Sequence, residues 1–553
     1  MLRLQPMNLL RGILNRMCAT GLVLGTLFFA FSLTPSLVPR PFAVQGIVSG
    51  LSLTAGYALG FAAAWLWRFL EMPMPGPRVS RAIKLCATAL CTLTAVLFLW
   101  RATGWQNALR EMMGMAPAGG GRFVSMAAIA LVVFGVMLAI GWAFRRTFHL
   151  LSSKVGRFVP HRVSLVIGLV AAFALFWLVI QGVAFSWLLR IADRSYQQLD
   201  AMIEGDLEPP ADAWKTGSTA SLLQWADLGR RGREFVALGP TAEQIEALTN
   251  APALEPIRVY VGLNAADTPH ERARLAIEEL KRVGAFERSV LLLVTPTGTG
   301  WIDPASQSPV EYLHHGDIAT VAAQYSYLPS HLALTTEGQY GAEMARALFV
   351  EVYSHWTSLP RDERPRLYLH GLSLGALNSD LSFDAYDILA DPFDGVLWAG
   401  PPFRSETWNH VTANRAEGSP AWLPRFRDGA VVRFMNQDGG LEVGEAPWGP
   451  HRIAYLQYAS DPITFFSVES LYREPAWLRQ PRGPDVHAAL RWYPVVTFLQ
   501  LAADMAVGGA PPGYGHSYAA RHYIDAWVAL TEPAGWSAED LQRLRALFDA
   551  GRE

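Results

Sequence analysis

Gly371-Leu372-Ser373-Leu374-Gly375 lies between two segments with different hydrophobic patterns. Residues 366–370 before it (Arg-Leu-Tyr-Leu-His) are typical of a short buried strand, and residues 376–381 after it indicate the start of a helix. A serine between two glycines at such a junction indicates a sharp turn, because bulkier neighbours would clash there. The pattern therefore predicts that Ser373 projects its hydroxyl from a strained strand-to-helix turn.

This turn is typical of the nucleophile elbow of α/β-hydrolases. A helix that begins directly after the serine directs its first N–H groups toward a developing oxyanion, so the backbone N–H of Leu374 is one predicted oxyanion donor. The second is predicted at Gly298, on the Gly-rich loop 295–301. This loop is not the usual His-Gly-Gly-Gly. A Gly-rich loop can also cradle phosphate, but the sequence has no P-loop lysine and no complete dinucleotide fingerprint.

The partners of the serine are predicted from their order along the chain. Hydrolases of this type carry the serine first, then an acid, then a histidine. Asp461 follows an apolar strand pattern at residues 453–458, and His516 lies on the Gly-rich loop 511–517. We therefore expect Ser373 to attack an acyl carbon, His516 to take its proton and Asp461 to fix the imidazole tautomer.

Each of these three residues could instead have a purely structural role. Ser373 could be a turn residue, Asp461 a helix N-cap and His516 a residue of a surface loop. Asp438 is a rival acid, although Asp-Gly is foremost a turn signal. His522 lies inside a predicted helix, which favours a structural role. His314 and His315, near Asp317, raise the alternative of a metal site. Because adjacent loop histidines cannot easily face one ion, the sequence predicts no metal and no other cofactor.

Composition divides the chain into two parts. Of its 553 residues 51% are hydrophobic, and the mean hydropathy of +0.17 is too high for an ordinary soluble enzyme. Residues 1–190 contain 17 basic and two acidic residues, whereas the remainder contains 29 basic and 46 acidic ones. A basic membrane part and an acidic soluble part are therefore expected. The acidic part argues against a nucleic-acid partner, because phosphate binding needs clustered cations. All three cysteines lie in the membrane part, which leaves the soluble part without disulfides.

Residues 1–190 are predicted to form a transmembrane domain of five helices. The apolar stretches are long enough to span a hydrocarbon core of roughly 20 helical residues, and they run over about 17–38, 42–67, 83–100, 123–144 and 163–189. No small-residue cleavage site follows the first stretch. The pairs Gly46/Gly50 and Gly56/Gly60 predict close helix packing.

The basic residues between these stretches predict the orientation. The N-terminal tail and the second and fourth loops carry 12 of them, and the first and third loops carry four. The N-terminus is therefore expected on the cytoplasmic side of the inner (cytoplasmic) membrane, and everything after about residue 190 is expected outside the cytoplasm. No stretch has a convincing mid-membrane charge, which argues against an ion pathway.

The soluble part is predicted to be an α/β domain. Residues 191–250 are interpreted as a juxtamembrane connector, and residues 251–553 as a domain with a doubly wound, mostly parallel sheet. Predicted strands are 257–263, 289–294, 319–325, 367–370, 395–399, 431–434 and 453–458, and predicted helices are 268–283, 343–359 and 518–530. The segment of about residues 462–512 is rich in aromatic side chains. It is interpreted either as ordinary core helices or as a cap-like insertion that covers the predicted active site.

The whole chain resembles a family of bacterial membrane-anchored α/β-hydrolases. The matching segments are Ser32–Arg40, Gly232–Val236, Val294–Trp301, Gln324–Pro329, Gly371–Gly375, Trp398–Phe403, Tyr455–Pro462 and Gly513–Tyr518. The resemblance implies a serine hydrolase with Ser373, Asp461 and His516 in the roles given above. The family often has Glu where this chain has Leu372. Similar hydrolases have been linked to removal of aminoacyl groups from membrane lipids.

Together these patterns predict a membrane-anchored serine esterase with an extracytoplasmic site. Five spans exceed what an enzyme for a soluble substrate requires, so the expected substrate is an ester in the bilayer, such as aminoacyl-phosphatidylglycerol. A phospholipase or an acyltransferase is the alternative enzyme, since water or an alcohol can resolve the same acyl-enzyme. A catalytically silent hydrolase fold that serves membrane assembly or transport is the alternative from another class.

Overall fold

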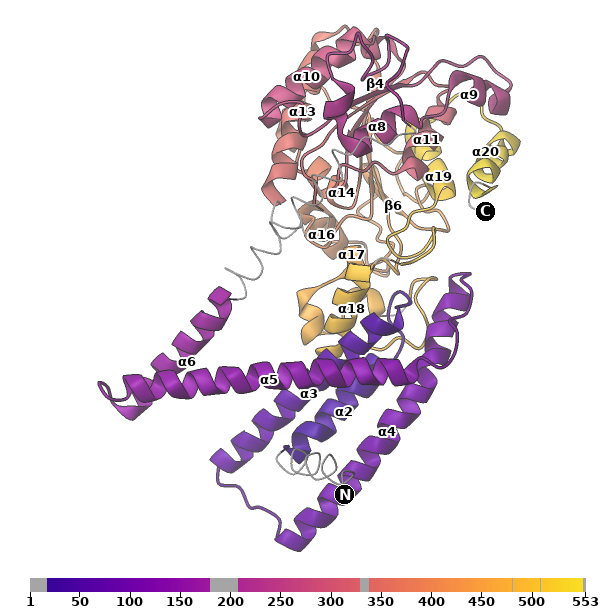
Figure 1. The fold of residues 1–553 in the computed structure, drawn as a ribbon. Coiled ribbons are helices and arrows are strands. Elements are labelled where there is room, and N and C mark those ends of the chain that lie inside the picture. Colours follow the sequence, from indigo (N-terminus) through magenta and orange to yellow (C-terminus); the bar gives the residue numbers. More distant parts are fainter. Residues whose placement is uncertain (1–16, 180–206, 329–337, 480, 508, 551–553) are drawn as a thin grey trace. The chain divides into compact units, whose positions relative to one another are not determined.

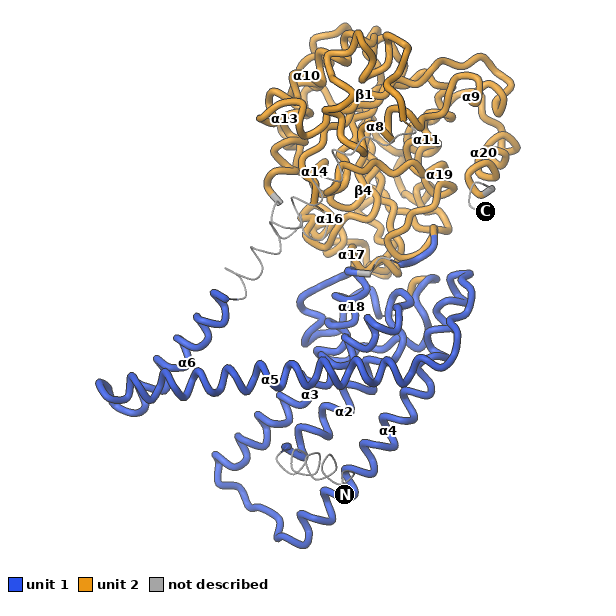
Figure 2. The backbone as a smooth tube through the Cα atoms, in the orientation of Figure 1, with its two compact units in different colours: residues 1–187, 466–479, 484–511 blue, residues 188–465, 480–483, 512–553 orange. Residues whose placement is uncertain are grey.

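The computed structural model describes residues 17–179, 207–328, 338–479, 481–507 and 509–550. The chain divides into two units (Figure 2). The helical unit comprises residues 1–187, 466–479 and 484–511, and the sheet unit comprises residues 188–465, 480–483 and 512–553. The chain thus leaves the sheet unit at Phe466 and finally returns to it at Pro512.

One parallel sheet forms the centre of the sheet unit. Within the described residues its seven strands follow the order β1-β3-β2-β4-β5-β7-β6. The strands are β1 (Ile257–Val261), β2 (Val290–Thr295), β3 (Ile318–Ala323), β4 (Arg366–Leu372), β5 (Gly395–Ala399), β6 (Val432–Met435) and β7 (Arg452–Leu456). Every residue of β2 and β3 is buried, as the continuous apolar runs predict. Because all pairs are parallel, the carboxyl ends of the strands share one edge of the sheet.

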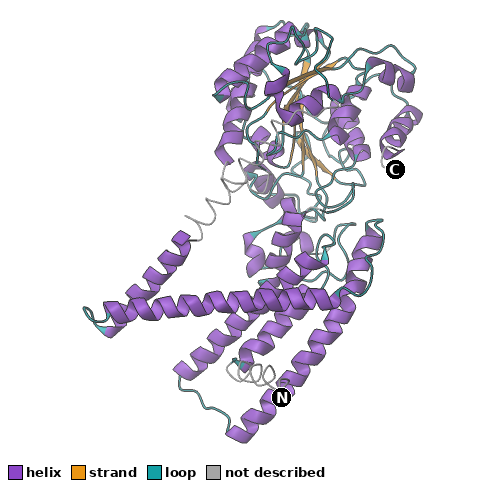
Figure 3. Cartoon of the chain, in the orientation of Figure 1, coloured by secondary structure: helices purple, strands orange, loops and turns teal. Residues whose placement is uncertain are grey.

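Helices cover both faces of this sheet (Figures 1 and 3). On one side α10 (Pro269–Arg282) packs against α13 (Gly338–Ser358), and on the other α11 (Pro304–Leu313) packs against α19 (Ala520–Thr531). Among the described residues of the sheet unit, the other helices of four or more residues are η2 (Trp225–Leu228), α8 (Gly229–Ala237), α9 (Ala242–Thr249), α14 (Leu374–Asp380), α15 (Ala385–Ile388), α16 (Glu406–Ala413), α17 (Pro462–Phe465) and α20 (Ala538–Ala550). The predicted doubly wound, parallel architecture is confirmed.

Part of the predicted connector belongs to the sheet unit. Its residues 191–206 lie outside the described residues, but from residue 207 the chain is folded, and α8 packs against β1. A Cβ at Gly232 would lie only 2.4 Å from the Tyr260 ring. The polar composition of this stretch suggested a connector, but the stretch contains helix α8, which covers the edge strand β1 of the sheet.

Three helices of the helical unit are long and apolar enough to cross a membrane. Within the described residues these are α3 (Phe42–Phe69), α4 (Pro77–Met112) and α5 (Phe123–Val155). The first predicted span, 17–38, is helical only in α2 (Ala19–Ser32), which at 14 residues is shorter than a span requires. The helix stops there because prolines follow, and Leu33, Leu37 and Val38 are buried in a non-helical segment. The fifth, 163–189, overlaps α6 (His161–Trp177), and its last residues lie outside the described residues.

Glycines allow the helices of this unit to pack closely. A Cβ at Gly56 of α3 would lie 2.5 Å from the Leu24 carbonyl oxygen on α2. On the same helix, a Cβ at Gly50 would lie 2.7 Å from the Ala130 carbonyl oxygen on α5. Both predicted small-residue pairs of α3 therefore mark helix crossings, one with each neighbour.

The aromatic insertion is built mainly into the helical unit. Residues 466–479 and 484–511 cluster with the N-terminal helices, and α18 (Val496–Val507) packs against α2 and α3. The ring of Tyr493 stacks on that of Phe31, with centroids 4.1 Å apart. The domain predicted for residues 251–553 is therefore interrupted by a segment that shares its packing with the N-terminal helices.

Candidate active site

Ser373 lies on a strained turn at the carboxyl end of β4. Its φ of 59° and ψ of −124° are unusual for a residue with a side chain. Its N–H donates to the Ala399 carbonyl oxygen at 3.0 Å, and its own carbonyl accepts from Ala376 and Leu377 in the first turn of α14. The turn thus ties the serine both to β5 and to the helix that follows.

The two glycines of the motif are required by close contacts. A Cβ at Gly371 would lie 2.3 Å from the Gly375 backbone, and a Cβ at Gly375 would lie 2.2 Å from the Thr295 carbonyl oxygen. Both distances are far below van der Waals contact. The sequence pattern therefore reflects the packing of β4, α14 and the end of β2 against one another.

Asp461 is fully buried after β7, and its carboxylate is held by several donors. One oxygen, Oδ1, accepts from the N–H groups of Ile463 and Thr464 at 2.8 and 3.3 Å. The other, Oδ2, accepts from the Tyr518 hydroxyl at 2.7 Å and from the Thr464 hydroxyl at 3.1 Å. Its remaining partner is His516, whose Nδ1 lies 2.7 Å away. The acid is therefore fixed at the start of α17, facing the histidine.

The His516 ring presents its other nitrogen without a partner. Because Nδ1 faces a carboxylate, we assign the ring proton there, which leaves Nε2 as an acceptor. Nε2 is buried and has no hydrogen-bond partner among the described residues. The ring packs on Gly400, where a Cβ would lie 2.7 Å from His516 Cε1. Gly400 directly follows Ala399, the residue that accepts the Ser373 N–H, so the three predicted residues gather at the same edge of the sheet.

Comparisons with known protein families identify the family of the chain. Residues 257–544 match the model of the alpha/beta-hydrolase family, and residues 33–240 match the model of the N-terminus of that family. The chain belongs to the alpha/beta-hydrolase family. No curated protein and no solved structure matches it. Membership of the family covers both the sheet unit and most of the N-terminal helices.

The predicted oxyanion donors of this alpha/beta-hydrolase lie on adjoining segments. Leu374 is the first residue of α14. The loop of Gly298 follows β2, where the Thr295 and Pro296 carbonyl oxygens lie against Gly375. Within this loop, the Thr297 N–H donates a hydrogen bond to the Trp301 carbonyl oxygen at 3.0 Å. Gly298 therefore belongs to a loop that adjoins the serine turn, and its role as a donor stays a prediction.

Two site neighbours were missed by the sequence interpretation. Tyr518 donates to Asp461, and its burial beside that carboxylate raises the pKa of Tyr518 well above the usual value, so it stays a hydrogen-bond donor. Asp303, the buried N-cap of α11, has a pKa raised to about 6 by burial, against opposing effects from Ala305 N–H, Tyr523 and His516. Asp followed by Pro304 is an N-cap signal, but nothing local indicates that it lies near the histidine.

The alternative candidates have structural contacts. Asp438 is exposed in a turn, where its N–H donates to Asn436 Oδ1 at 3.0 Å. His522 Nδ1 pairs with the Tyr458 hydroxyl at 2.6 Å. His314 Nε2 pairs with the Thr531 hydroxyl at 3.0 Å, and burial lowers the pKa of His314 to about 3. His315 instead faces the Trp536 ring.

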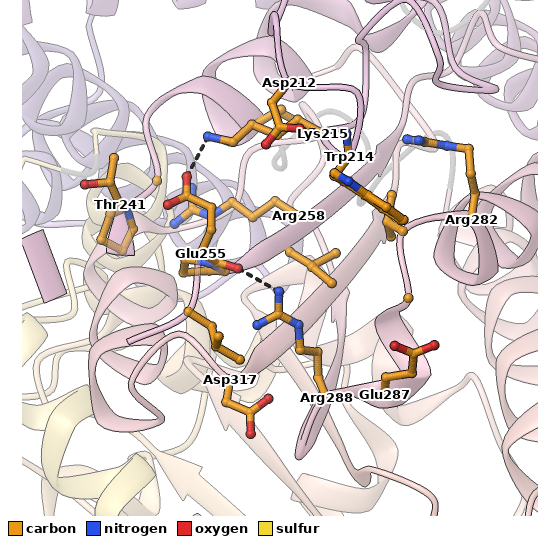
Figure 4. A pocket seen from close by; sticks show the side chains of 18 of the residues that line it. Asp212, Trp214, Lys215, Thr241, Glu255, Arg258, Arg282, Glu287, Arg288 and Asp317 are labelled. Carbon is orange, nitrogen blue, oxygen red and sulfur yellow. Dashed lines mark hydrogen bonds and ion pairs between the residues drawn. The ribbon is translucent and has the colours of Figure 1, made fainter. Parts of the chain in front are cut away.

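A cavity of about 590 Å³ lies away from this site (Figure 4). It is bordered by residues that precede β1, β2 and β3, which places it at the amino ends of the strands. Its cations are engaged: Lys215 pairs with Glu255 at 2.6 Å, and Arg288 donates to the Glu255 and Gly316 carbonyl oxygens. Its size alone therefore does not make it the catalytic site, since the serine lies at the opposite ends of the strands.

Proposed function

We propose that this protein is a membrane-anchored serine hydrolase that cleaves carboxylic esters. Ser373 is the nucleophile, His516 the general base and Asp461 the residue that orients the histidine. The observation that carries the proposal is the 2.7 Å hydrogen bond between His516 Nδ1 and the buried Asp461 carboxylate. It leaves Nε2 free to accept a proton, at the edge of the sheet where Ser373 has the strained conformation of a nucleophile elbow.

The reaction follows from these roles. Ser373 Oγ attacks the ester carbonyl carbon while His516 Nε2 takes its proton, and the resulting oxyanion is stabilised by the N–H groups of Leu374 and Gly298. The C–O bond to the alcohol then breaks as His516 returns the proton to that alcohol. Water attacks the acyl-enzyme by the same route, with His516 again as base, and releases the acid and the free Ser373 hydroxyl.

The proposed substrate is an ester of a membrane lipid. Helices long and apolar enough to cross a membrane precede the catalytic unit, and the basic loops favour an orientation with that unit outside the cytoplasm. The acidic residues after position 190 outnumber the basic ones by 17, which disfavours plain anionic phosphatidylglycerol. An aminoacyl ester of this lipid carries an added ammonium group, and this group also makes the ester carbonyl more electrophilic.

A fluorophosphonate probe tests the nucleophile, because only an activated serine reacts readily with it. The purified protein in detergent should be labelled, and the Ser373→Ala variant should not. The His516→Ala variant should lose nearly all labelling, because His516 pairs with Asp461. His522→Ala is its matched control and should keep the labelling, because His522 pairs with the Tyr458 hydroxyl instead. Absence of labelling in the wild-type protein would indicate the catalytically silent alternative.

A lipid assay tests the substrate. The wild-type enzyme is given aminoacyl-phosphatidylglycerol and unmodified phosphatidylglycerol in parallel. Release of free amino acid, absent with Ser373→Ala, is the expected result. Release of fatty acid from both lipids with the aminoacyl ester intact would make the enzyme a phospholipase, and transfer of the acyl group to an added alcohol in preference to water would make it an acyltransferase.

A further inference from the structure

Another cavity of the sheet unit lies at the carboxyl ends of β1 and β3, and we call it the β1/β3 cavity. Its volume is about 510 Å³, within the range of small-ligand sites. It is lined by Leu263 after β1, by residues 325–327 after β3, and by residues near the starts of α10 and α13, which pack on each other (Figure 1). The β1/β3 cavity therefore belongs to the same edge of the sheet as Ser373.

Among the described residues that line this cavity, Arg272 of α10 carries the one positive charge, and only 5% of the residue is exposed. Its Nη1 donates to the Leu263 and Ala266 carbonyl oxygens at 3.5 and 2.8 Å. Its Nε donates to Met344 Sδ at 3.4 Å. Nη2 has no partner among the described residues and remains accessible at the cavity, and no carboxylate in that part of the chain forms an ion pair with Arg272.

Two other arginines with buried side chains do have carboxylate partners. In the sheet unit, Arg258 donates to both oxygens of Glu311 at 2.7 and 2.6 Å. In the helical unit, Arg40 pairs with Asp504 at 2.5 Å. Burial of a charge costs free energy that a paired anion offsets. Arg272 bears this cost without such an anion, which indicates that an anion from outside the chain completes its surroundings.

The start of α10 adds to the positive potential of the cavity. Pro269, the first residue of this helix, lines the cavity, and helix N-termini favour negative charge. Burial lowers the pKa of Arg272, and the nearby Tyr327 and Asp267 oppose this effect. Because arginine keeps its proton in proteins, the side chain is a desolvated cation with unpaired N–H donors.

The other polar groups of the cavity are compatible with a phosphate. The Tyr327 hydroxyl donates to Asn264 Oδ1 at 2.5 Å, which leaves the amide N–H groups of Asn264 as donors. Asp267 and Glu343 also line the cavity, but both are exposed, and solvent screens exposed charges more than buried ones. The planar guanidinium of arginine matches phosphate oxygens, so a phosphate is the anion that this lining fits best.

We propose that the β1/β3 cavity binds the phosphate of the substrate lipid and that Arg272 determines this specificity. The inference rests on the proposed ester hydrolysis at Ser373. In the strand order β1-β3-β2-β4 only β2 separates β3 from β4, so these two strands lie about 10 Å apart. In aminoacyl-phosphatidylglycerol a glycerol unit joins the ester to the phosphate. One substrate can therefore present its phosphate to the cavity and its ester to the serine.

Arg272→Gln in the full-length protein tests the subsite with two esters in detergent. Aminoacyl-phosphatidylglycerol contains the phosphate, and an aminoacyl ester of a neutral alkylglycerol lacks it. The variant should raise KM for the phospholipid by about 10- to 100-fold, the effect of losing hydrogen bonds to a charged group. The constants for the neutral ester should change by less than about threefold. Arg274→Gln, at an exposed position of the same helix, is the matched control and should leave both esters unaffected.

Two further variants change the charge of the cavity and keep every bond of Arg272. Asn264→Asp adds a carboxylate and should raise KM for the phospholipid by about fivefold, whereas Glu343→Gln removes one and should lower it. The neutral ester should respond to neither change. This pair replaces Arg272→Gln where that variant yields too little folded protein, since both positions are exposed.

Equal effects of Arg272→Gln on the two esters, or no effect on either, would overturn the inference while the proposed function stands. A lower phospholipid KM with Asn264→Asp would assign the cavity to an ammonium group, which also contradicts it. Inhibition by inorganic phosphate that Arg272→Gln abolishes, with KM for the phospholipid unchanged, would make the cavity a site for free phosphate and not for the lipid. A wild-type protein that hydrolyses neither ester and is not labelled by a fluorophosphonate would instead remove the proposed function, on which the inference rests.

Discussion

At the scale of single residues, Asp461 combines burial with an unusually complete set of donors. Backbone N–H groups, two hydroxyls and the His516 ring surround one carboxylate. Such a group stays aligned when substrate binds, because any rotation would break several bonds at once. This arrangement favours an orienting acid over an ordinary N-cap, which needs only the two N–H contacts.

Asp461→Asn should therefore lower kcat by about 10⁴-fold, because an amide no longer selects the tautomer with Nε2 as acceptor. Steady-state ester hydrolysis and the rate of fluorophosphonate labelling measure the effect. Asp438→Asn, at the exposed turn, is the control and should leave both rates unchanged. A severe loss with Asp438→Asn and a mild one with Asp461→Asn would show that the acid is misassigned.

Asp303 should make stability depend on pH. Burial raises the pKa of Asp303 from 3.8 to about 6, so the charged form is disfavoured in the folded state. The stability that the protonated carboxyl contributes is fully present below about pH 4 and is lost as pH rises through about 6.

Asp303→Asn keeps a capping side chain and removes this penalty. The variant should be more stable than wild type at pH 8, by on the order of 1–3 kcal/mol, and the difference should shrink at pH 5. Melting temperatures in detergent at the two pH values provide the measurement. An equal difference at both pH values would contradict the titration of Asp303.

At the scale of elements, close approach of backbones explains the glycine pattern in both units. Gly375 lets α14 meet the end of β2, and Gly56 lets α3 meet α2. In each case the atom that a Cβ would meet is a backbone carbonyl oxygen, which cannot rotate away as a flexible side chain can. The two elements themselves would have to separate.

Gly56→Ala should destabilise the helical unit by about 2 kcal/mol, in the range of overpacking in a tight core. Gly135→Ala is the matched control, because Gly135 also lies in a long apolar helix but a Cβ there meets nothing within 4 Å. That variant should melt at or slightly above the wild-type temperature, since alanine favours the helix. Thermal unfolding in one detergent compares them, and equal behaviour of the two variants would refute the crossing at Gly56.

At the scale of the whole molecule, charge separates the chain into a basic N-terminal part and an acidic remainder. For the five predicted spans, the 12 basic residues on one set of loops and four on the other predict a cytoplasmic N-terminus and an exported C-terminus. A reporter that is active only after export, fused behind Glu553, should be active. Activity of a reporter that works only in the cytoplasm, fused at the same place, would reverse the orientation.

The amino-acid pattern alone was sufficient to predict the class of the sheet and the strained turn at Ser373. Alternating apolar strands and amphipathic helices require a parallel sheet with helices on both faces, and Gly371-Leu-Ser-Leu-Gly375 requires the turn that carries Ser373. The order of Ser373, Asp461 and His516 also indicated which acid and histidine meet. These features are readable because each depends on local periodicity or on a short motif.

Which segments share a core depends on contacts between residues that are distant in the sequence. The Tyr518 contact to Asp461, and the pairing of Arg40 with Asp504, join residues 57 and 464 positions apart, and no local pattern encodes such partners. Apolar composition likewise does not distinguish a spanning helix from a buried loop, so the first predicted span proved to be a 14-residue helix followed by a buried segment. Burial against distant residues selects between these outcomes, because the apolar free energy depends on the area removed from water and not on where the covering residues lie in the chain.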